Sequence, residues 1–180
     1  LSLLDLPFNP LRETPLGRIS AAALDSFEHS TRAFGKPAFG LGHTTIDGEE
    51  VAVHEEVVLR LPWCDLLHFR RATHRPQDKA VLMVAPMSGH YATLLRGTVQ
   101  AFLPDHDVYI TDWRDARDMP VMGLDFDLDD YIDHIVGFIN HLGPDCHVIA
   151  VCQPAVPVLA AVSLMNADAP HTAPRSMTLI

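Results

Sequence analysis

A cysteine at position 152 stands between two apolar segments of different character. Residues 146–151 form a short run rich in β-branched residues, which is typical of a buried parallel strand. Residues 154–165 form an alanine-rich apolar run that is longer than most strands, so it predicts a buried helix. A thiol at this junction lies at the edge where open parallel sheets place their sites, and the N-terminus of a helix favours the thiolate. We therefore expect Cys152 to be a nucleophile.

The residues around Cys152 have the spacing of the nucleophile elbow of α/β-hydrolases, which is usually G-x-S-x-G. Here the five positions are Ala150, Val151, Cys152, Gln153 and Pro154. Alanine is small enough for a close approach of strand and helix, and Pro154 suits the first helical position because an N–H there would be unpaired. The alternative interpretation is a buried core cysteine, which is the commonest role of a free cysteine.

Attack on an ester or thioester carbonyl places negative charge on its oxygen, which needs two preorganised N–H donors. One expected donor is the backbone N–H of Gln153, directly after the nucleophile. The second is expected from the loop after an earlier strand, at Met87, Ser88 and Gly89. Ser88 also suits the cap of the next helix, and the two roles are compatible.

Composition excludes several classes of protein. The net charge of −10 argues against a nucleic-acid partner. No run approaches the roughly 20 apolar residues of a membrane span. Three cysteines without C-x-x-C spacing favour a reducing cytoplasm. Histidine and cysteine show no metal-site spacing, so we expect neither a metal nor another bound cofactor.

The remaining segments predict the elements that position Cys152. The first, 18–34, is expected to be a helix that follows a proline-rich arm. Asp47-Gly48 predicts a β-hairpin between 44–46 and 51–60, and 61–71 either extends this pairing or forms a further strand. From residue 80 onward strands and helices alternate: strands at 80–85, 108–111, 146–151 and 176–180, and helices at 91–103, 128–142 and 154–165.

This order predicts an α/β protein with a partial α/β-hydrolase fold, in which a mostly parallel sheet with flanking helices follows an N-terminal helix and β-hairpin. We divide the chain into residues 1–50, with the arm, the helix and the start of the hairpin, and residues 51–180, the N-terminal part of the hydrolase domain. In the hydrolase order the acid and histidine follow the nucleophile. We therefore expect both beyond Ile180, in a missing C-terminal part of the same enzyme, and little activity from this chain alone.

Five segments resemble the intracellular polyhydroxybutyrate (polyhydroxyalkanoate) depolymerase family: KPAFG at 36–40, VAPMSGHYATLLRGT at 84–98, DHDVYITDW at 105–113, DLDDYI at 127–132 and HVIAVCQPAVPV at 147–158. The resemblance implies an α/β-hydrolase fold and places the family's cysteine nucleophile at Cys152. It also implies a cytoplasmic, granule-associated enzyme whose partner is the amorphous storage polymer. The implied products are 3-hydroxybutyrate oligomers and monomers, or CoA thioesters if CoA accepts the acyl group.

Two alternatives remain open at this point. A polyhydroxyalkanoate synthase also has a cysteine at such an elbow, but it would have glycines in place of Gln153-Pro154. A non-catalytic granule-binding protein would use Cys152 only for packing.

Overall fold

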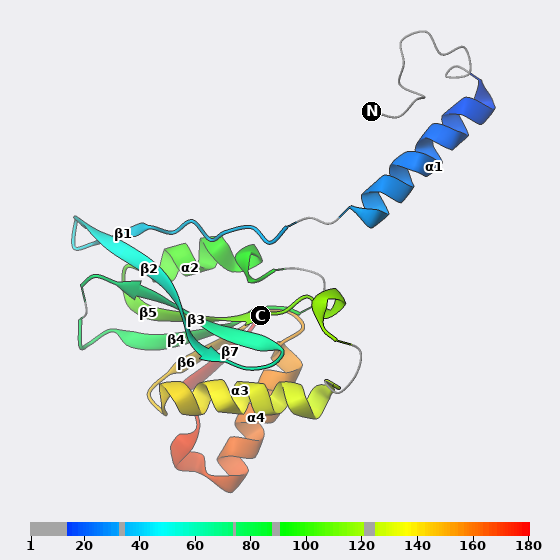
Figure 1. Cartoon of the computed structure of the whole chain (residues 1–180). Helices are drawn as coiled ribbons and strands as arrows, with labels where there is room; N and C mark the ends of the chain where they lie inside the picture. Colours follow the sequence, from blue (N-terminus) through cyan, green and yellow to red (C-terminus); the bar gives the residue numbers. More distant parts are fainter. Residues whose placement is uncertain (1–13, 33–34, 74, 88–90, 121–124) are drawn as a thin grey trace. The chain divides into compact units, whose positions relative to one another are not determined.

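The computed structural model describes residues 14–32, 35–73, 75–87, 91–120 and 125–180 (Figure 1). The chain divides into two compact units, Leu1–Lys36 and Pro37–Ile180. The division expected from the sequence was placed after residue 50, whereas in the structure the unit that contains the hairpin begins at Pro37.

The described residues of the first unit form the helix α1 (Pro15–Thr31). Its N-terminus is capped by Thr14, whose hydroxyl accepts a hydrogen bond from the N–H of Gly17, and Pro15 occupies the first helical position. This cap explains why the helix begins before Arg18, where the apolar pattern predicted its start.

The second unit is built on a seven-stranded mixed sheet in the order β1-β2-β3-β5-β4-β6-β7. Neighbouring strands pair antiparallel from β1 to β5 and parallel from β5 to β7. The parallel half thus contains the strands that alternate with helices, as predicted. The strands are β1 (His43–Ile46), β2 (Glu49–Arg60), β3 (Cys64–Arg71), β4 (Lys79–Val84), β5 (His106–Trp113), β6 (His147–Ala150) and β7 (Ser176–Leu179).

The predicted hairpin is confirmed as β1 and β2. Its two-residue turn has positive φ at both Asp47 (52°) and Gly48 (88°), which suits the twist of a hairpin. The segment 61–71, for which two outcomes were open, supplies a separate strand, β3, which pairs with β2 on one side and with β5 on the other.

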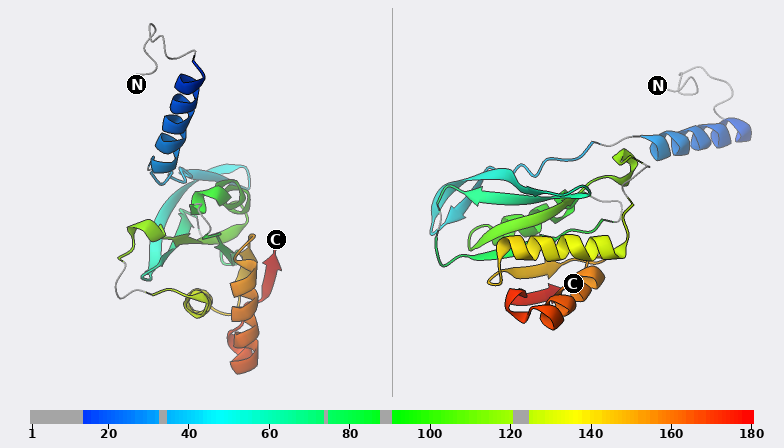
Figure 2. Two further views of the ribbon diagram at one scale, coloured as in Figure 1. Left: turned by 90° about the vertical axis from the view of Figure 1, so that its right-hand side faces the viewer. Right: turned by 60° about the horizontal axis from the view of Figure 1, so that its bottom comes forward.

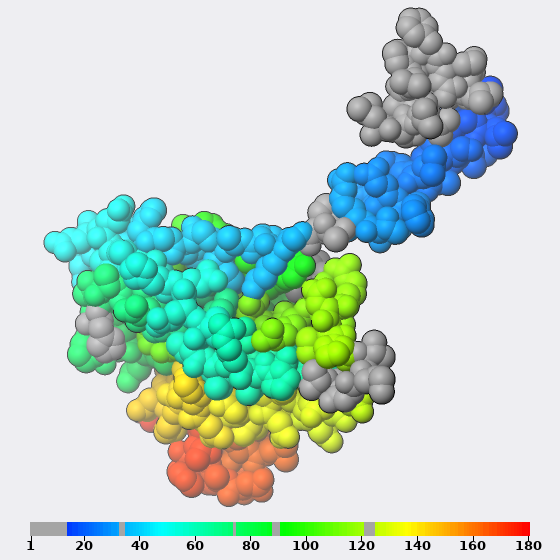
Figure 3. Space-filling view, in the orientation of Figure 1, coloured from blue at the N-terminus to red at the C-terminus, as the bar shows by residue number. Residues whose placement is uncertain are grey.

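Helices cover both faces of the sheet (Figures 1 and 2). Alternate residues of β4 face opposite sides: Val81 and Met83 belong to the core shared with α2 (Arg96–Phe102), whereas Leu82 and Val84 belong to the core shared with α3 (Leu128–Leu142) and α4 (Ala155–Asp168). On the face shown in Figure 3, α3 lies between the first strands and the segment that contains α4. Two-sided coverage explains why β4 is apolar along most of its length.

The helix at 128–142 has the bounds that the sequence predicted. Its start is fixed by a capping box: the carboxylate of Asp127 accepts from the N–H groups of Asp129 and Asp130, and that of Asp130 accepts from the N–H of Asp127. Two apolar residues at the starts of predicted helices are exposed. Leu128 is the first residue of α3, and Leu94 lies in a 3₁₀ turn, η2 (Ala92–Leu95), where a helical stripe does not apply.

In the described residues, no helix is long and apolar enough to cross a membrane.

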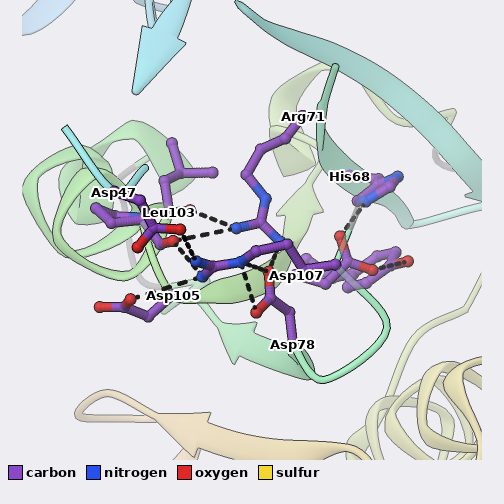
Figure 4. A network of polar contacts seen from close by, with 10 residues as sticks. Asp47, His68, Arg71, Asp78, Leu103, Asp105 and Asp107 are labelled. Atoms are coloured by element: carbon purple, nitrogen blue, oxygen red, sulfur yellow. Dashed lines mark hydrogen bonds and ion pairs between the residues drawn. The ribbon is translucent and has the colours of Figure 1, made fainter. Parts of the chain in front are cut away.

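A buried ion pair joins the end of β3 to the residue before β4 (Figure 4). The guanidinium of Arg71 binds the carboxylate of Asp78, and these side chains are only 2% and 3% exposed. Arg71 also donates to the carbonyl oxygens of Leu103 and Pro104 at 3.0 and 3.3 Å. Burial alone would raise the pKa of Asp78, but hydrogen bonds from Arg75 and Arg71 outweigh it and lower that pKa.

Two adjacent arginines of β3 provide a matched test of this pair. Arg71→Ala should reduce the free energy of unfolding by about 2–3 kcal/mol, because it leaves the buried Asp78 with Arg75 as its remaining partner and removes the donor to Leu103 and Pro104. Arg70→Ala removes an exposed pair with Glu56 and should cost at most about 1 kcal/mol. Urea denaturation measures both, and equal losses would contradict the assignment.

The same pair should contribute to acid sensitivity. Because the pKa of Asp78 is lowered in the folded state, the contribution is fully present above the unfolded pKa of about 4 and is lost as pH falls through the folded pKa. The stability difference between the wild type and Arg71→Ala should therefore shrink below about pH 4.

Candidate active site

Cys152 lies in a tight turn between the end of β6 and the start of α4, as the elbow pattern predicted. Its φ is +68°, in the left-handed region that residues with a Cβ rarely adopt. Its side chain is exposed, so the alternative of a buried core cysteine is wrong for this residue. Backbone strain of this kind persists only where surrounding structure imposes it, and it is often found at functional sites.

Strands on either side of β6 impose this conformation. The N–H of Val151 donates to the carbonyl oxygen of Val84 in β4 at 3.4 Å, and the N–H of Cys152 donates to that of Ile180 after β7 at 2.7 Å. The sheet thus continues into the turn. Because its own N–H is already bonded, Cys152 presents to solvent its thiol rather than a main-chain donor.

The backbone N–H groups at the start of α4 differ in whether they are hydrogen-bonded. The N–H groups of Ala155 and Val156 donate to the carbonyl oxygens of Cys152 and Gln153, and that of Val158 donates to Pro154. Prolines at 154 and 157 have no N–H. The N–H of Gln153 has no acceptor among the residues that the structure describes. It is therefore available next to the thiol, where the sequence predicted an oxyanion donor.

The loop after β4 reaches the elbow at Met87. The N–H of Met87 donates to the side-chain oxygen Oε1 of Gln153 at 3.0 Å. The structure therefore brings together three of the predicted site residues, Cys152, Gln153 and Met87. Ser88 and Gly89, the other two, lie outside the described residues.

Two residues of β5 that the sequence analysis did not select hold this loop in place. The hydroxyl of Thr111 accepts from the N–H of Ala85 at 2.9 Å, and the indole N–H of Trp113 donates to the carbonyl oxygen of Ala85 at 3.0 Å. Pro86 has no N–H, so Met87 carries the next donor of the loop. The sequence signal for this role was a polar residue, Thr111, at the end of the apolar strand predicted at 108–111. In the structure Thr111 is completely buried.

A pocket of about 430 Å³ adjoins the loop, within the size range of small-molecule sites. All three of its charged lining residues are paired: Arg114 with Asp65 at 3.0 Å, and Arg117 with Asp115 at 2.6 Å. Hydrogen bonds from Arg117 lower the pKa of Asp115 to about 2, so it is ionised at neutral pH. The lining consists of Met87, Tyr91, Trp113, Arg114, Asp115, Ala116 and Arg117. Met87 therefore links this pocket to the elbow.

A histidine–carboxylate pair lies elsewhere. The ring nitrogen Nε2 of His68 is 2.7 Å from a carboxylate oxygen of Asp107 (Figure 4). The His68 ring also stacks on that of Tyr109. Asp107 is aligned with Ala80 near the start of β4, whereas Cys152 lies beyond the other end of the sheet's parallel strands. This pair therefore cannot serve the thiol of Cys152 within this chain.

The other two cysteines have different surroundings from Cys152. Both are buried. Burial raises the pKa of Cys64 well above its usual value and raises that of Cys146 to about 11. Both are therefore protonated at neutral pH and inaccessible. In the described part of the chain, no three His, Cys, Asp or Glu side chains gather in a way that could hold a metal ion.

Comparisons with known proteins identify the fold. No protein-family model matches the sequence, and no curated protein matches it. Solved structures match at low identity. A lipase candidate from Acinetobacter baumannii AYE has a TM-score of 0.52 and 11% identity over 71% of this chain and 40% of its own. The Francisella virulence factor BioJ has a TM-score of 0.50 and 13% identity over 99% of this chain and 56% of its own.

A third match is 2-hydroxy-6-oxo-6-phenylhexa-2,4-dienoate hydrolase from Rhodococcus sp. strain RHA1. It has a TM-score of 0.50 and 15% identity over 71% of this chain and 46% of its own. This chain thus spans about half the length of these structures. At such identities the likeness concerns the fold alone, and it agrees with the strand order and the elbow. The second unit therefore has part of an α/β-hydrolase fold.

Proposed function

We propose that this chain carries the nucleophile of an intracellular depolymerase that cleaves ester bonds of polyhydroxybutyrate. The observation that carries the proposal is the exposed thiol of Cys152, held at φ +68° beside the N–H of Gln153. A strained, accessible nucleophile at the end of a parallel strand is what acyl transfer on this fold requires. The substrate comes from the sequence resemblance, which spans both the elbow and the loop at Met87.

The proposed reaction forms a thioester. The Cys152 thiolate attacks the ester carbonyl carbon, and the new C–S bond places the carbonyl electron pair on oxygen. The N–H groups of Gln153 and Met87 hold this oxyanion. The C–O bond then breaks, the alkoxide leaves and takes up a proton, and water or CoA displaces the thiol from the acyl group. The acid and histidine are proposed to lie beyond Ile180, as the α/β-hydrolase order implies.

The pocket beside Met87 supports a substrate of alternating apolar and ester groups. Its lining combines the apolar surfaces of Met87 and Trp113 with charged residues. One repeat of the polymer could place its methyl group against these surfaces while its carbonyl lies at the elbow. We propose the surface of an amorphous polymer granule as the partner.

The full-length protein, incubated with amorphous polymer and separately with hydroxybutyryl-CoA, tests this function. We expect soluble hydroxybutyrate products from the polymer, and Cys152→Ala should lower this rate by at least about 10³-fold because no nucleophile remains. Growth of polymer from the CoA thioester would instead identify a synthase. Binding of polymer without turnover would identify a granule-binding protein.

A second prediction concerns the strained backbone at Cys152. Cys152→Gly should be more stable than Cys152→Ala by about 1 kcal/mol, because glycine adopts a positive φ without steric cost and alanine does not. Thermal unfolding of the two variants measures this difference. If the alanine variant is equally stable, the turn is not strained, and its conformation cannot be taken as a sign of function.

A further inference from the structure

The side chain of Gln153 accepts a hydrogen bond from the N–H of Met87, a donor that the proposed reaction needs. Its Oε1 accepts from the N–H of Met87 at 3.0 Å, across 66 positions of sequence. The backbone N–H of the same residue has no acceptor among the described residues. Of the two donors proposed to hold the oxyanion, one is thus already bonded to a carbonyl oxygen within the protein.

An amide oxygen resembles the carbonyl oxygen of an ester, since both are sp² oxygens that accept from an N–H in the same geometry. The N–H of Met87 can make one strong, linear hydrogen bond at a time. Gln153 and the substrate therefore compete for it. The bond is exposed to solvent, so the side chain can rotate away without opening the core.

We propose that the amide of Gln153 fills the Met87 donor in the free enzyme and is displaced by the substrate carbonyl. This inference rests on the proposed function and assigns a second role to the residue after the nucleophile. The bonded side chain keeps the N–H of Met87 satisfied until substrate arrives.

Once the Gln153 amide is displaced, the N–H of Met87 makes a different hydrogen bond with the bound substrate than with the oxyanion. Exchanging the Gln153 carbonyl for a neutral ester carbonyl gains little, because both bonds are between uncharged groups. Exchanging it for the oxyanion gains more, because charge-assisted hydrogen bonds are roughly twice as strong. The cost of displacing Gln153 is the same in both cases, so it lowers kcat/KM without changing kcat, and only the charge-assisted bond favours the transition state over the bound substrate.

Two substitutions at Gln153 in the full-length protein test the inference. Gln153→Met keeps the length of the side chain but offers only a weak sulfur acceptor. Gln153→Asn keeps the amide on a side chain one methylene shorter, which cannot reach Met87 in the same backbone. Asn166→Ala is the control, because it removes an exposed amide of α4 that donates to the carbonyl oxygen of Val162 within the same helix.

The first readout does not need activity. In both Gln153 variants the amide proton resonance of Met87 should shift upfield and become more temperature-dependent, as expected for a lost hydrogen bond, while the control leaves it unchanged. An unchanged Met87 resonance in Gln153→Met would overturn the inference even if the protein is an active depolymerase.

The second readout is kinetic. With a soluble 3-hydroxybutyrate oligomer, kcat/KM should rise about fivefold in Gln153→Met and Gln153→Asn, the value of one exposed neutral hydrogen bond. A tenfold or larger fall in kcat in both variants would show that the side chain assists the reaction and would overturn the inference. If the wild type hydrolyses nothing, the proposed function fails, and the Met87 resonance alone decides whether Gln153 occupies the donor.

Discussion

The left-handed backbone at Cys152 is the constraint on which the site depends. It costs on the order of 1–3 kcal/mol and is maintained by hydrogen bonds to Val84 on one side and Ile180 on the other. Three consequences follow from this one turn. The thiol is exposed, the next N–H is left without an acceptor among the described residues, and the side chain of Gln153 reaches the loop at Met87.

The order of the strands places the turn at Cys152 beside the other parts of the site. Because β4 lies between β5 and β6, the loop after β4 is next to both the elbow and the end of β5. Thr111 and Trp113 fix that loop through both backbone groups of Ala85. Apolar side chains on both faces of β4 hold the strand itself in place, and Arg71 with Asp78 secures the far end of the sheet. The geometry at Met87 therefore depends on residues distributed over much of the second unit.

Local patterns predicted most of the elements, because each depends on neighbours a few residues away. The turn at Asp47-Gly48, the capped helix at 128–142 and the junction at Cys152 are all of this kind. The sequence could not reveal pairs that only the fold brings together. The hydrogen bond between Met87 and Gln153 joins residues 66 positions apart, and that between Ala85 and Thr111 joins residues 26 apart. A 3₁₀ turn replaces the first part of the helix expected at 91–103, which leaves Leu94 exposed.

Direct trapping of the acyl-enzyme tests the central claim, that the thiol of Cys152 accepts an acyl group. The full-length protein is mixed with a soluble 3-hydroxybutyrate oligomer, quenched in acid within the first turnover and digested for peptide mass spectrometry. The account predicts one hydroxybutyryl group, labile to hydroxylamine as a thioester is, on the peptide that contains Cys152, with the buried Cys64 and Cys146 unmodified. Turnover of the oligomer with the acyl group on another residue, or with none on Cys152 at any quench time, would contradict it.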